Sequence, residues 1–427
     1  MESKKRPTKK EELPLGIPYS DSTAVLSSTL KIGKAIAANR ICYQPMEGCD
    51  GTKSGAPDEL TKRRYLRFAR GGAGLIWFEA TAVVPEGRAN PRQLMLTEEN
   101  ADEFATLVSG IKEECLKANG FEPLVVCQLT HSGRWSKPNG VPEPLVAYHR
   151  TPMEKNGPLS EDAILSDEYL DALPEHYALS SRLAERVGFD GVDIKACHGY
   201  LLCELLSAYT RKGKHGGDYE NRTRAFFGAV DAARASLSSH KIIASRFNVF
   251  DGYPYPYGIG DSGEASVPDF KEGKRIAADL CAHGASLLNV TMGCPYTNHE
   301  VNRPTVFAQN EMPYVSILRM LEGARAVKEA APSAAVVASG ISFLGALAAN
   351  VCAAGVTAGD YDMAGFGRQT FSYPTLARDI VKTGKMEERN LCLTCGKCTE
   401  LMRNGKTPGC VIYDKEVYAT LYKEIKR

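Results

Sequence analysis

Gly188-Phe-Asp-Gly-Val-Asp-Ile-Lys-Ala-Cys-His-Gly-Tyr-Leu-Leu202 contains a turn, a short strand and three proton-handling side chains in immediate succession. Its first four residues have the composition of a turn, and the run 192–194 is typical of a buried strand. Lys195, His198 and Tyr200 follow directly. Each could be structural by itself, but barrels of alternating strands and helices keep their catalytic side chains at the C-terminal ends of the strands. The clustering therefore indicates an active site with these three residues as its candidate catalytic groups.

The alternation of strand and helix extends through the chain. Besides 191–194, short apolar runs that predict strands occupy residues 40–46, 74–82, 123–129, 242–249, 286–292, 336–340 and 362–367. Segments with helical spacing lie between them, at 59–70, 98–116, 167–187, 221–237, 269–283, 315–329, 343–354 and 374–382. Such alternation predicts parallel pairing, and eight units close into a TIM (β/α)8 barrel. A doubly wound open sheet is the alternative, but no Gly-x-Gly-x-x-Gly turn follows any of the strands.

The composition is that of an ordinary water-soluble protein. A net charge of +1 gives no global attraction to nucleic acid or to a membrane surface. The first ten residues contain five basic side chains but no apolar core of a secretory signal, so we expect a solvated tail. Thirteen cysteines without such a signal indicate reduced thiols and a cytoplasmic location.

Two loops are too long to be simple connections. Residues 130–166 and 250–267 both follow predicted strands, and the second contains Tyr253-Pro-Tyr-Pro-Tyr257. Long loops of this kind are often functional lids. We therefore expect both loops to build the substrate pocket, with the three tyrosines as one wall.

A cysteine motif near the C-terminus is the most specific signal in the sequence. Cys392, Cys395 and Cys398 are spaced by two residues each, and Cys410 follows after a loop. This spacing suits a [4Fe–4S] cluster better than structural zinc, which favours two separated Cys-x-x-Cys pairs. A structural zinc site remains the alternative. The predicted fold is thus a barrel with a C-terminal cysteine-rich iron–sulfur extension.

Three segments follow from these patterns. We expect an N-terminal tail at 1–29, the barrel at 30–385, and a cluster-binding extension with a C-terminal helix at 386–427. A cluster transfers single electrons, so another group in the protein must use them.

Several separate motifs in order resemble the old yellow enzyme family of flavin barrels. The resemblance covers about residues 30–414 and is to the iron–sulfur branch, which includes 2,4-dienoyl-CoA reductase and trimethylamine dehydrogenase. It rests on the four cysteines and on Asn39-Arg-Ile-Cys-Tyr-Gln-Pro-Met46, Gln128-Leu-Thr-His-Ser-Gly-Arg134, Gly188-Phe-Asp-Gly-Val-Asp193, His198-Gly-Tyr-Leu201, Gly216-Gly-Asp-Tyr-Glu-Asn-Arg222 and Gly367-Arg368. These relatives continue into FAD- and nucleotide-binding domains, which we expect this protein to lack.

The resemblance implies FMN in the mouth of the barrel. The backbone at Pro45 and Met46 and the small Ala80 would lie along the isoalloxazine ring. Gln128 would hydrogen-bond the pyrimidine edge, and Arg246 would place a positive charge near N1, where the reduced flavin is anionic.

The resemblance also assigns the phosphate and the catalytic residues. Gly340, Gly367 and Arg368 would hold the phosphate, in the loops after the seventh and eighth strands. His198 would polarise an electron-withdrawing group of the substrate, and Tyr200 would protonate the carbon opposite hydride attack.

Two residues depart from the family pattern. Lys195 stands where relatives have histidine or tyrosine, and its positive charge would suit a substrate carboxylate or a developing enolate better than an amine. Glu47 stands where many relatives have Thr, Ser or Cys near the flavin carbonyl, so the role of that position is open.

The sequence as a whole predicts a reductase of activated C=C bonds in unsaturated carbonyls, carboxylates or thioesters. Its electrons would come from a partner protein, either an NADH-oxidising flavoprotein or a ferredoxin, and it could form a homo-oligomer. The alternatives are an oxidative N-demethylase of the trimethylamine dehydrogenase type, an electron-transfer subunit, and a zinc-binding structural protein.

Overall fold

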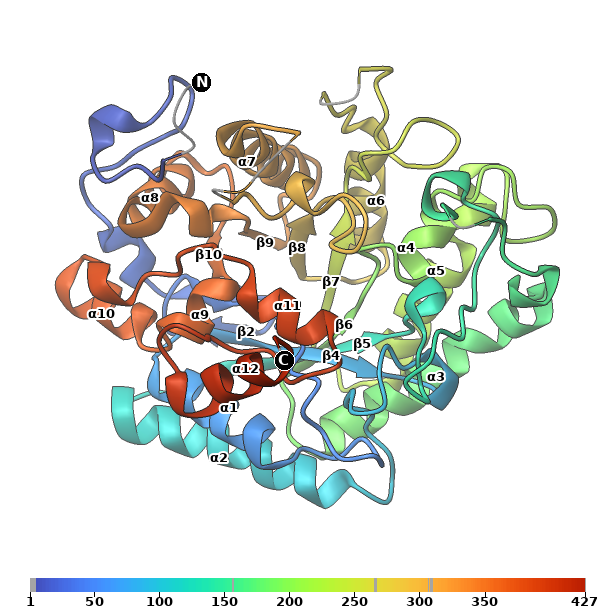
Figure 1. Ribbon diagram of the computed structural model, residues 1–427, viewed down its shortest axis with the longest axis horizontal. Coiled ribbons are helices and arrows are strands. Elements are labelled where there is room, and N and C mark those ends of the chain that lie inside the picture. The colour runs from blue at the N-terminus through green and yellow to red at the C-terminus, as the bar shows by residue number, and fades with distance from the viewer. Residues whose placement is uncertain (1–4, 156, 265–266, 306, 308–309, 427) are drawn as a thin grey trace.

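The computed structural model describes residues 5–155, 157–264, 267–305, 307 and 310–426. Its centre is a closed barrel of parallel strands in the order β10-β3-β4-β5-β6-β7-β8-β9 (Figure 1). The first and last strands pair with Ala364 opposite Ile41, which closes the sheet and rules out the open doubly wound alternative. The strands are β3 (Ile41–Tyr43), β4 (Leu75–Ala82), β5 (Leu124–Thr130), β6 (Gly191–Ile194), β7 (Ile242–Asn248), β8 (Leu287–Thr291), β9 (Ala335–Ala338) and β10 (Met363–Phe366). The predicted barrel is thereby confirmed.

Helices surround the barrel (Figure 1). The helix α1 (Glu59–Arg70) has the predicted bounds because Asp58 caps its first turn in a reciprocal arrangement with Thr61. The other long helices also lie where helical spacing predicts them. They are α2 (Ala101–Asn119), α3 (Asp167–Arg186), α5 (Tyr219–Ser236), α6 (Lys271–Ala282), α7 (Pro313–Ala330), α8 (Ala348–Ala358) and α10 (Leu376–Thr383).

Short helices follow the ends of three strands, and the first and last of these helices were not predicted. They are α4 (Leu201–Leu206), the 3-10 helix η8 (Ile341–Leu347) and α9 (Arg368–Ser372). Segments of five to seven residues are too short to show a helical period. The helix predicted at 343–354 is divided into η8 and α8, and Gly345, with φ 59° and ψ −126°, interrupts the helical geometry inside η8.

A small hairpin closes the N-terminal end of the barrel. β1 (Leu30–Ile32) and β2 (Ala35–Ala37) pair antiparallel. Ile32 and Ala37 are fully buried in one apolar cluster with inward-facing strand residues, among them Trp77. The interior is therefore packed at this end, and only the opposite end of the barrel is left for a site.

The N-terminal segment packs along the outside of the barrel. Arg6 Nε donates to the Phe343 carbonyl at 3.2 Å, and the Ser20 amide donates to the Asn350 carbonyl at 3.2 Å. Leu26 is fully buried. Within the predicted solvated tail, Lys5, Thr8, Lys9 and Lys10 are exposed, whereas the Arg6 side chain bonds to η8 and Pro7 is buried; residues 1–4 lie outside the described chain.

The cysteine-rich extension, red in Figure 1, crosses the C-terminal ends of the strands. It contains α11 (Lys397–Arg403), the π-helical turn η10 (Lys415–Ala419) and α12 (Thr420–Glu424). Asp414 accepts hydrogen bonds from Arg63 of α1 at 2.8 and 2.9 Å and is also paired with Arg67. These ion pairs fix the extension to the barrel beside its open end.

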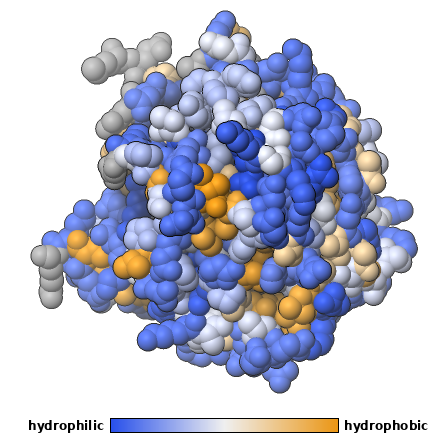
Figure 2. Space-filling model, turned by 90° about the vertical axis from the view of Figure 1, so that its right-hand side faces the viewer, coloured by the Kyte–Doolittle hydropathy of each residue, from blue (hydrophilic) through white to orange (hydrophobic). Residues whose placement is uncertain are grey.

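The face shown in Figure 2 is largely hydrophilic, and the apolar side chains on it form small separate groups. Within the described chain, one helical stretch, 341–358, is long and apolar enough to cross a membrane. Most of this stretch is buried inside the protein, at 67% of its residues, because η8 and α8 pack on the barrel. Its apolar character is thus explained by its place in the protein core.

Candidate active site

A cavity of about 1120 Å³ opens at the C-terminal end of the barrel. It is bounded by strand ends, by the segment after β8 and by the cysteine-rich extension. All the side chains predicted to bind flavin or to act in catalysis line it: Pro45, Met46, Ala80, Gln128, Lys195, His198, Tyr200, Arg246, Gly340, Gly367 and Arg368. The structure brings this set together, although their individual roles remain predictions.

A buried carboxylate organises the floor of the cavity. Asp193 Oδ2 accepts hydrogen bonds from Gln128 Nε2 at 2.6 Å and from Trp77 Nε1 at 2.8 Å. Asp193 Oδ1 accepts from the Arg246 amide at 2.7 Å. Burial raises the pKa of Asp193 to about 6. Sequence reasoning assigned Asp193 no role, although a carboxylate between Val192 and Ile194 in a buried strand was the available signal.

Three polar atoms near this floor are buried without a hydrogen-bond partner among the described residues. They are Gln44 Nε2, Asn289 Oδ1 and Arg246 Nε. Asn289 Nδ2 donates to Gln44 Oε1 at 2.8 Å, which fixes both amides. Buried polar groups are nearly always satisfied, so this donor and acceptor set fits a flat ligand with polar groups along its edge. The isoalloxazine ring of FMN has this character.

The other end of the cavity has the chemistry of a phosphate site. Gly340 directly precedes η8, and Gly367 directly precedes α9. The backbone N–H groups in the first turn of a helix have no partner within the helix and can donate hydrogen bonds to an anion. The Arg368 guanidinium donates to the Pro304 carbonyl at 3.3 Å and forms no ion pair with any carboxylate in the described residues. An FMN phosphate fits here.

Lys195, Tyr200 and Glu47 form one contact group on the cavity wall. Lys195 Nζ lies 3.5 Å from the centroid of the Tyr200 ring. The Tyr200 hydroxyl donates to Glu47 Oε2 at 3.3 Å and lies 3.2 Å from the Tyr296 hydroxyl. Burial, together with the Glu47 charge, raises the pKa of Tyr200 well above its usual value. Burial also raises the pKa of Glu47 and lowers that of Lys195.

His198 is held in an uncommon backbone conformation at the end of β6. Its φ is 66°, and its amide donates to Asn248 Oδ1 at 3.2 Å. Its Nε2 lies 3.1 Å from Thr291 Oγ1. Burial, followed by the charges of Arg246 and Lys195, lowers the pKa of His198 well below its usual value. The imidazole is therefore neutral at physiological pH.

The predicted substrate wall is wrong, because neither long loop lines the cavity. In the Tyr253–Tyr257 segment, Tyr255 is 68% exposed and Tyr253 packs under Arg150. The aromatic wall comes from Tyr296, which stacks on Trp135 with ring centroids 4.3 Å apart. Tyr296 lies in a segment that lacked a recognisable motif, so sequence reasoning missed it.

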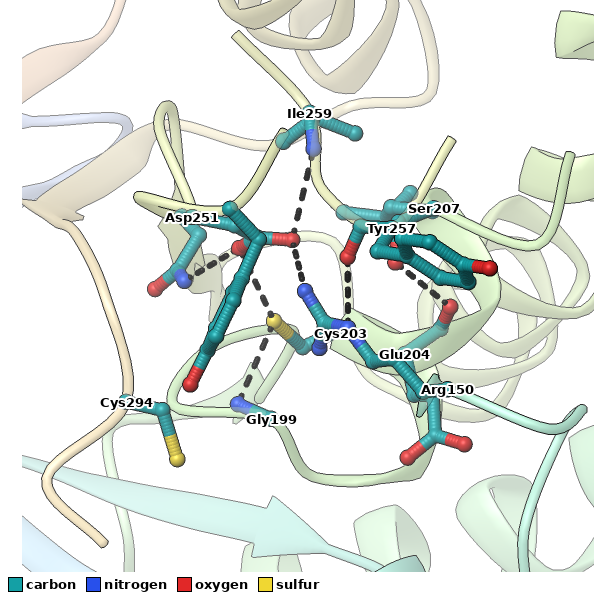
Figure 3. A network of polar contacts seen from close by, with 12 residues as sticks. Arg150, Gly199, Cys203, Glu204, Ser207, Asp251, Tyr257, Ile259 and Cys294 are labelled. Atoms are coloured by element: carbon teal, nitrogen blue, oxygen red, sulfur yellow. Dashed lines mark hydrogen bonds and ion pairs between the residues drawn. The ribbon is translucent and has the colours of Figure 1, made fainter. Parts of the chain in front are cut away.

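The long loops instead support the catalytic segment from behind. In Figure 3 Arg150 and Asp251 point toward each other, and Arg150 Nη2 donates to Asp251 Oδ2 at 2.9 Å. Asp251 Oδ1 accepts from Asn248 Nδ2 at 2.7 Å, and Asn248 is the residue that holds the His198 amide. The Cys203 thiol also donates to Asp251 Oδ1 at 3.8 Å. The buried ion pair thus joins both loops to the position of His198.

The four cysteines of the extension line a second cavity of about 380 Å³. Cys398 lines both cavities, as does Arg368. Among the described residues, no three His, Cys, Asp or Glu side chains are grouped closely enough to hold a single metal ion. The four cysteines line the second cavity, and their ligation of a cluster remains a prediction.

Comparisons with known proteins place this site in context. The sequence profile of the NADH:flavin oxidoreductase / NADH oxidase family matches residues 26–387. The chain is 30% identical over 246 residues to the NADPH dehydrogenase of Geobacillus thermodenitrificans, covering 57% of this chain and 67% of that protein.

Two solved structures share the fold. A 2-naphthoyl-CoA reductase in complex with 2-naphthoyl-CoA superimposes with a TM-score of 0.77 at 19% identity, over 94% of this chain and 58% of that chain. The old yellow enzyme homologue from Zymomonas mobilis superimposes with a TM-score of 0.67 at 20% identity, over 91% and 98% of the two chains. The present chain therefore spans little more than half of the former protein and nearly all of the latter.

Proposed function

Because this chain belongs to the NADH:flavin oxidoreductase / NADH oxidase family of flavin-dependent oxidoreductases, we propose that it is an FMN-dependent reductase of activated C=C bonds. The substrates would be α,β-unsaturated carbonyls, carboxylates or thioesters. The observation that carries the proposal is the group of His198, Tyr200, Lys195 and Glu47 on the wall of a cavity whose floor and far end fit FMN. A hydrogen-bond donor and a proton donor are the two groups that such a reduction requires.

The chain's own residues would hold FMN at both ends. Asp193 holds the Gln128 side chain and the Arg246 backbone, and these two residues would hold the ring, while Arg368 would hold the phosphate. Arg246 adds a positive charge where the reduced ring is anionic. Bound FMN supplies the hydride that the reaction needs.

His198 would bind the electron-withdrawing oxygen of the substrate. A neutral imidazole carries a single N–H, and its hydrogen bond with Thr291 decides which ring nitrogen holds it. When the Thr291 hydroxyl donates to Nε2, Nδ1–H is left to donate to the substrate. The developing negative charge on the substrate oxygen is then stabilised by a group that needs no proton transfer.

Tyr200 would deliver the proton to carbon. Its hydroxyl is neutral over the physiological range, because its pKa is raised. Glu47 accepts its hydrogen bond and so orients it, while Lys195 lies against its ring. Loss of the proton leaves a phenolate whose charge Lys195 would stabilise.

The electron supply involves the extension 386–427. The four cysteines would hold a [4Fe–4S] cluster, which supplies single electrons from a partner protein. Cys398 and Arg368 line both cavities, which supports a short path for electrons from the proposed cluster to the proposed flavin. The name of the Geobacillus relative supports a nicotinamide dinucleotide as the original reductant.

Substitution of Tyr200 by Phe tests the proposal. We expect FMN in the Tyr200→Phe variant to be reduced by dithionite at the normal rate, while reduction of an enone or unsaturated thioester slows at least 100-fold, as general acid loss predicts. Unimpaired alkene reduction in this variant would show that Tyr200 is not the proton donor. Failure of the wild-type protein to reduce any activated alkene would reject the function itself.

A further inference from the structure

Two arginine side chains at the mouth of the cavity share one hydrogen-bond acceptor. Arg303 Nη2 and Arg403 Nη2 donate to the carbonyl oxygen of Pro295, at 3.0 and 3.1 Å. Arg303 belongs to the segment after β8, and Arg403 ends α11 of the extension. Two donors on one oxygen keep the guanidinium groups within roughly 6 Å of each other.

No carboxylate of the described residues neutralises these two positive charges. Neither Arg303 nor Arg403 forms an ion pair with a described carboxylate, whereas Arg64, Arg134 and Arg150, which are equally internal or more so, each have one. Like charges held together are unfavourable unless an anion accompanies them, and more so where one of them, here Arg303, is partly buried. The arrangement therefore has the character of an anion site.

Further positive groups face the same place. Burial and the charge of Arg368 lower the pKa of Arg303 to about 10. The pKa of His299 is lowered by burial and then by Arg303 and Arg403. The carboxylate of Glu300, the next residue in the chain, accepts the amides of Asn310 and Glu311 at 2.9 and 3.1 Å. A bound anion would relieve the mutual repulsion of the cations.

Arg303 also faces the catalytic residues. It lines the same cavity as His198 and Tyr296, and its charge contributes to the lowered pKa of His198. Its Nη1 donates to Thr399 Oγ1 at 3.0 Å, which holds the guanidinium between the barrel and the extension. Arg403 is exposed to solvent. A ligand could therefore bind the arginine pair through an anionic group at its outer end while the rest of the ligand extends into the cavity.

We propose that Arg303 and Arg403 form a phosphate subsite for a ligand that reacts at the proposed flavin. This inference rests on the proposed function, because the subsite would bind the end of the ligand that lies far from the reacting group. The phosphate of FMN would be held separately by Arg368. The shared chemistry is the pyrophosphate of an adenine nucleotide carrier, which an unsaturated acyl thioester of coenzyme A and a nicotinamide dinucleotide both contain.

Calorimetric titration of the flavin-loaded protein with ADP tests the subsite directly. We expect Arg303→Gln and Arg403→Gln to weaken ADP binding roughly tenfold or more each, since charge-assisted hydrogen bonds to phosphate are lost. Arg389→Gln, a charge-matched change of an 80% exposed arginine in the same extension, should bind ADP like the wild type. Unchanged ADP affinity in both cavity variants would overturn the subsite. Loss of FMN from Arg303→Gln, with normal ADP affinity in the loaded fraction, would overturn it too, by assigning Arg303 to the flavin phosphate.

Two kinetic experiments then show whether the nucleotide carrier is the substrate or the reductant. If the carrier is the substrate, Arg403→Gln should raise KM for an unsaturated acyl-CoA but not for the matching pantetheine thioester, which lacks the nucleotide. If the carrier is the reductant, the same variant should slow flavin reduction by NADPH without affecting reduction by dithionite. Failure of the proposed function is a different result: arginine-dependent ADP binding in a protein that reduces no alkene.

Discussion

The ammonium group of Lys195 packs against the ring of Tyr200, with Nζ 3.5 Å from the ring centroid, and both residues are buried. The sequence suggested that Lys195 acts on the substrate as a free charge. In the structure its closest aromatic contact is the proposed proton donor, which links the lysine to the protonation step. A positive charge over a tyrosine stabilises the phenolate more than the phenol.

Removal of the Lys195 charge should therefore slow the proton transfer. We expect Lys195→Met to lower kcat for alkene reduction up to roughly 30-fold, since a desolvated cation–π contact is worth about 2 kcal/mol. Stopped-flow absorbance should show an unchanged rate of flavin reduction. Lys195→Arg, which retains the charge, should keep most of the activity; equal losses in both variants would contradict a role for the charge.

Glu47 should impose a pH dependence on turnover. Burial raises its pKa, and once ionised it raises the pKa of Tyr200 and makes the phenol a weaker acid. Alkene reduction should thus fall as pH rises through the pKa of Glu47. In Glu47→Gln, which keeps a hydrogen-bond acceptor but no charge, a profile of kcat against pH should lack this inflection. If the inflection persisted in this variant, it would belong to the titration of another group.

The cysteine motif can be tested by composition and absorbance. Anaerobically purified protein should contain iron and acid-labile sulfide in equal amounts, with broad visible absorption beyond that of the flavin. Cys395→Ser should lose both while the barrel stays folded. Cys115→Ser, a buried thiol in α2, is the matched control and should retain the cluster. Zinc in place of iron would support the structural alternative.

His131 should make folding stability depend on pH. Its Nδ1 accepts the Gly133 amide at 3.0 Å and its Nε2 lies 2.9 Å from the Tyr169 hydroxyl, while burial lowers its pKa to about 4. The unfolded chain protonates this histidine below its ordinary pKa, whereas the folded protein does not. Its contribution is complete above about pH 6.5 and is lost as pH falls to about 4, to a total of roughly 3 kcal/mol. Urea unfolding at pH 7 and pH 4.5 should show a smaller difference in His131→Gln than in the wild type.

The ion pair behind the catalytic segment should affect both stability and activity. Arg150→Met leaves Asp251 buried and uncompensated, which costs roughly 3–5 kcal/mol in unfolding free energy. Arg150→Met combined with Asp251→Asn should recover part of this loss, because no lone charge remains. Denaturant unfolding measures both. If the double variant lost as much unfolding free energy as the two single variants together, the two residues would act independently.

Local patterns determined the barrel. Strands such as β9 are continuous apolar runs buried on both faces, and long helices such as α3 bury one stripe, so each element shows its period within its own residues. The candidate catalytic and flavin-binding residues could also be placed at the open end of the barrel, because their motifs lie at strand ends. Short helices such as α9 could not be, since they contain barely more than one turn.

Relations between distant segments were decided by the tertiary structure alone. The sequence placed Lys195, His198 and Tyr200 together because they are adjacent, but Tyr296 and Arg303 reach the same cavity from another loop. The long loops looked like pocket walls because of their length and composition, yet their side chains pair with each other behind the site. Local sequence fixes backbone conformation and the face that is buried, whereas the side chains that meet in a cavity depend on how the closed barrel brings its loops together.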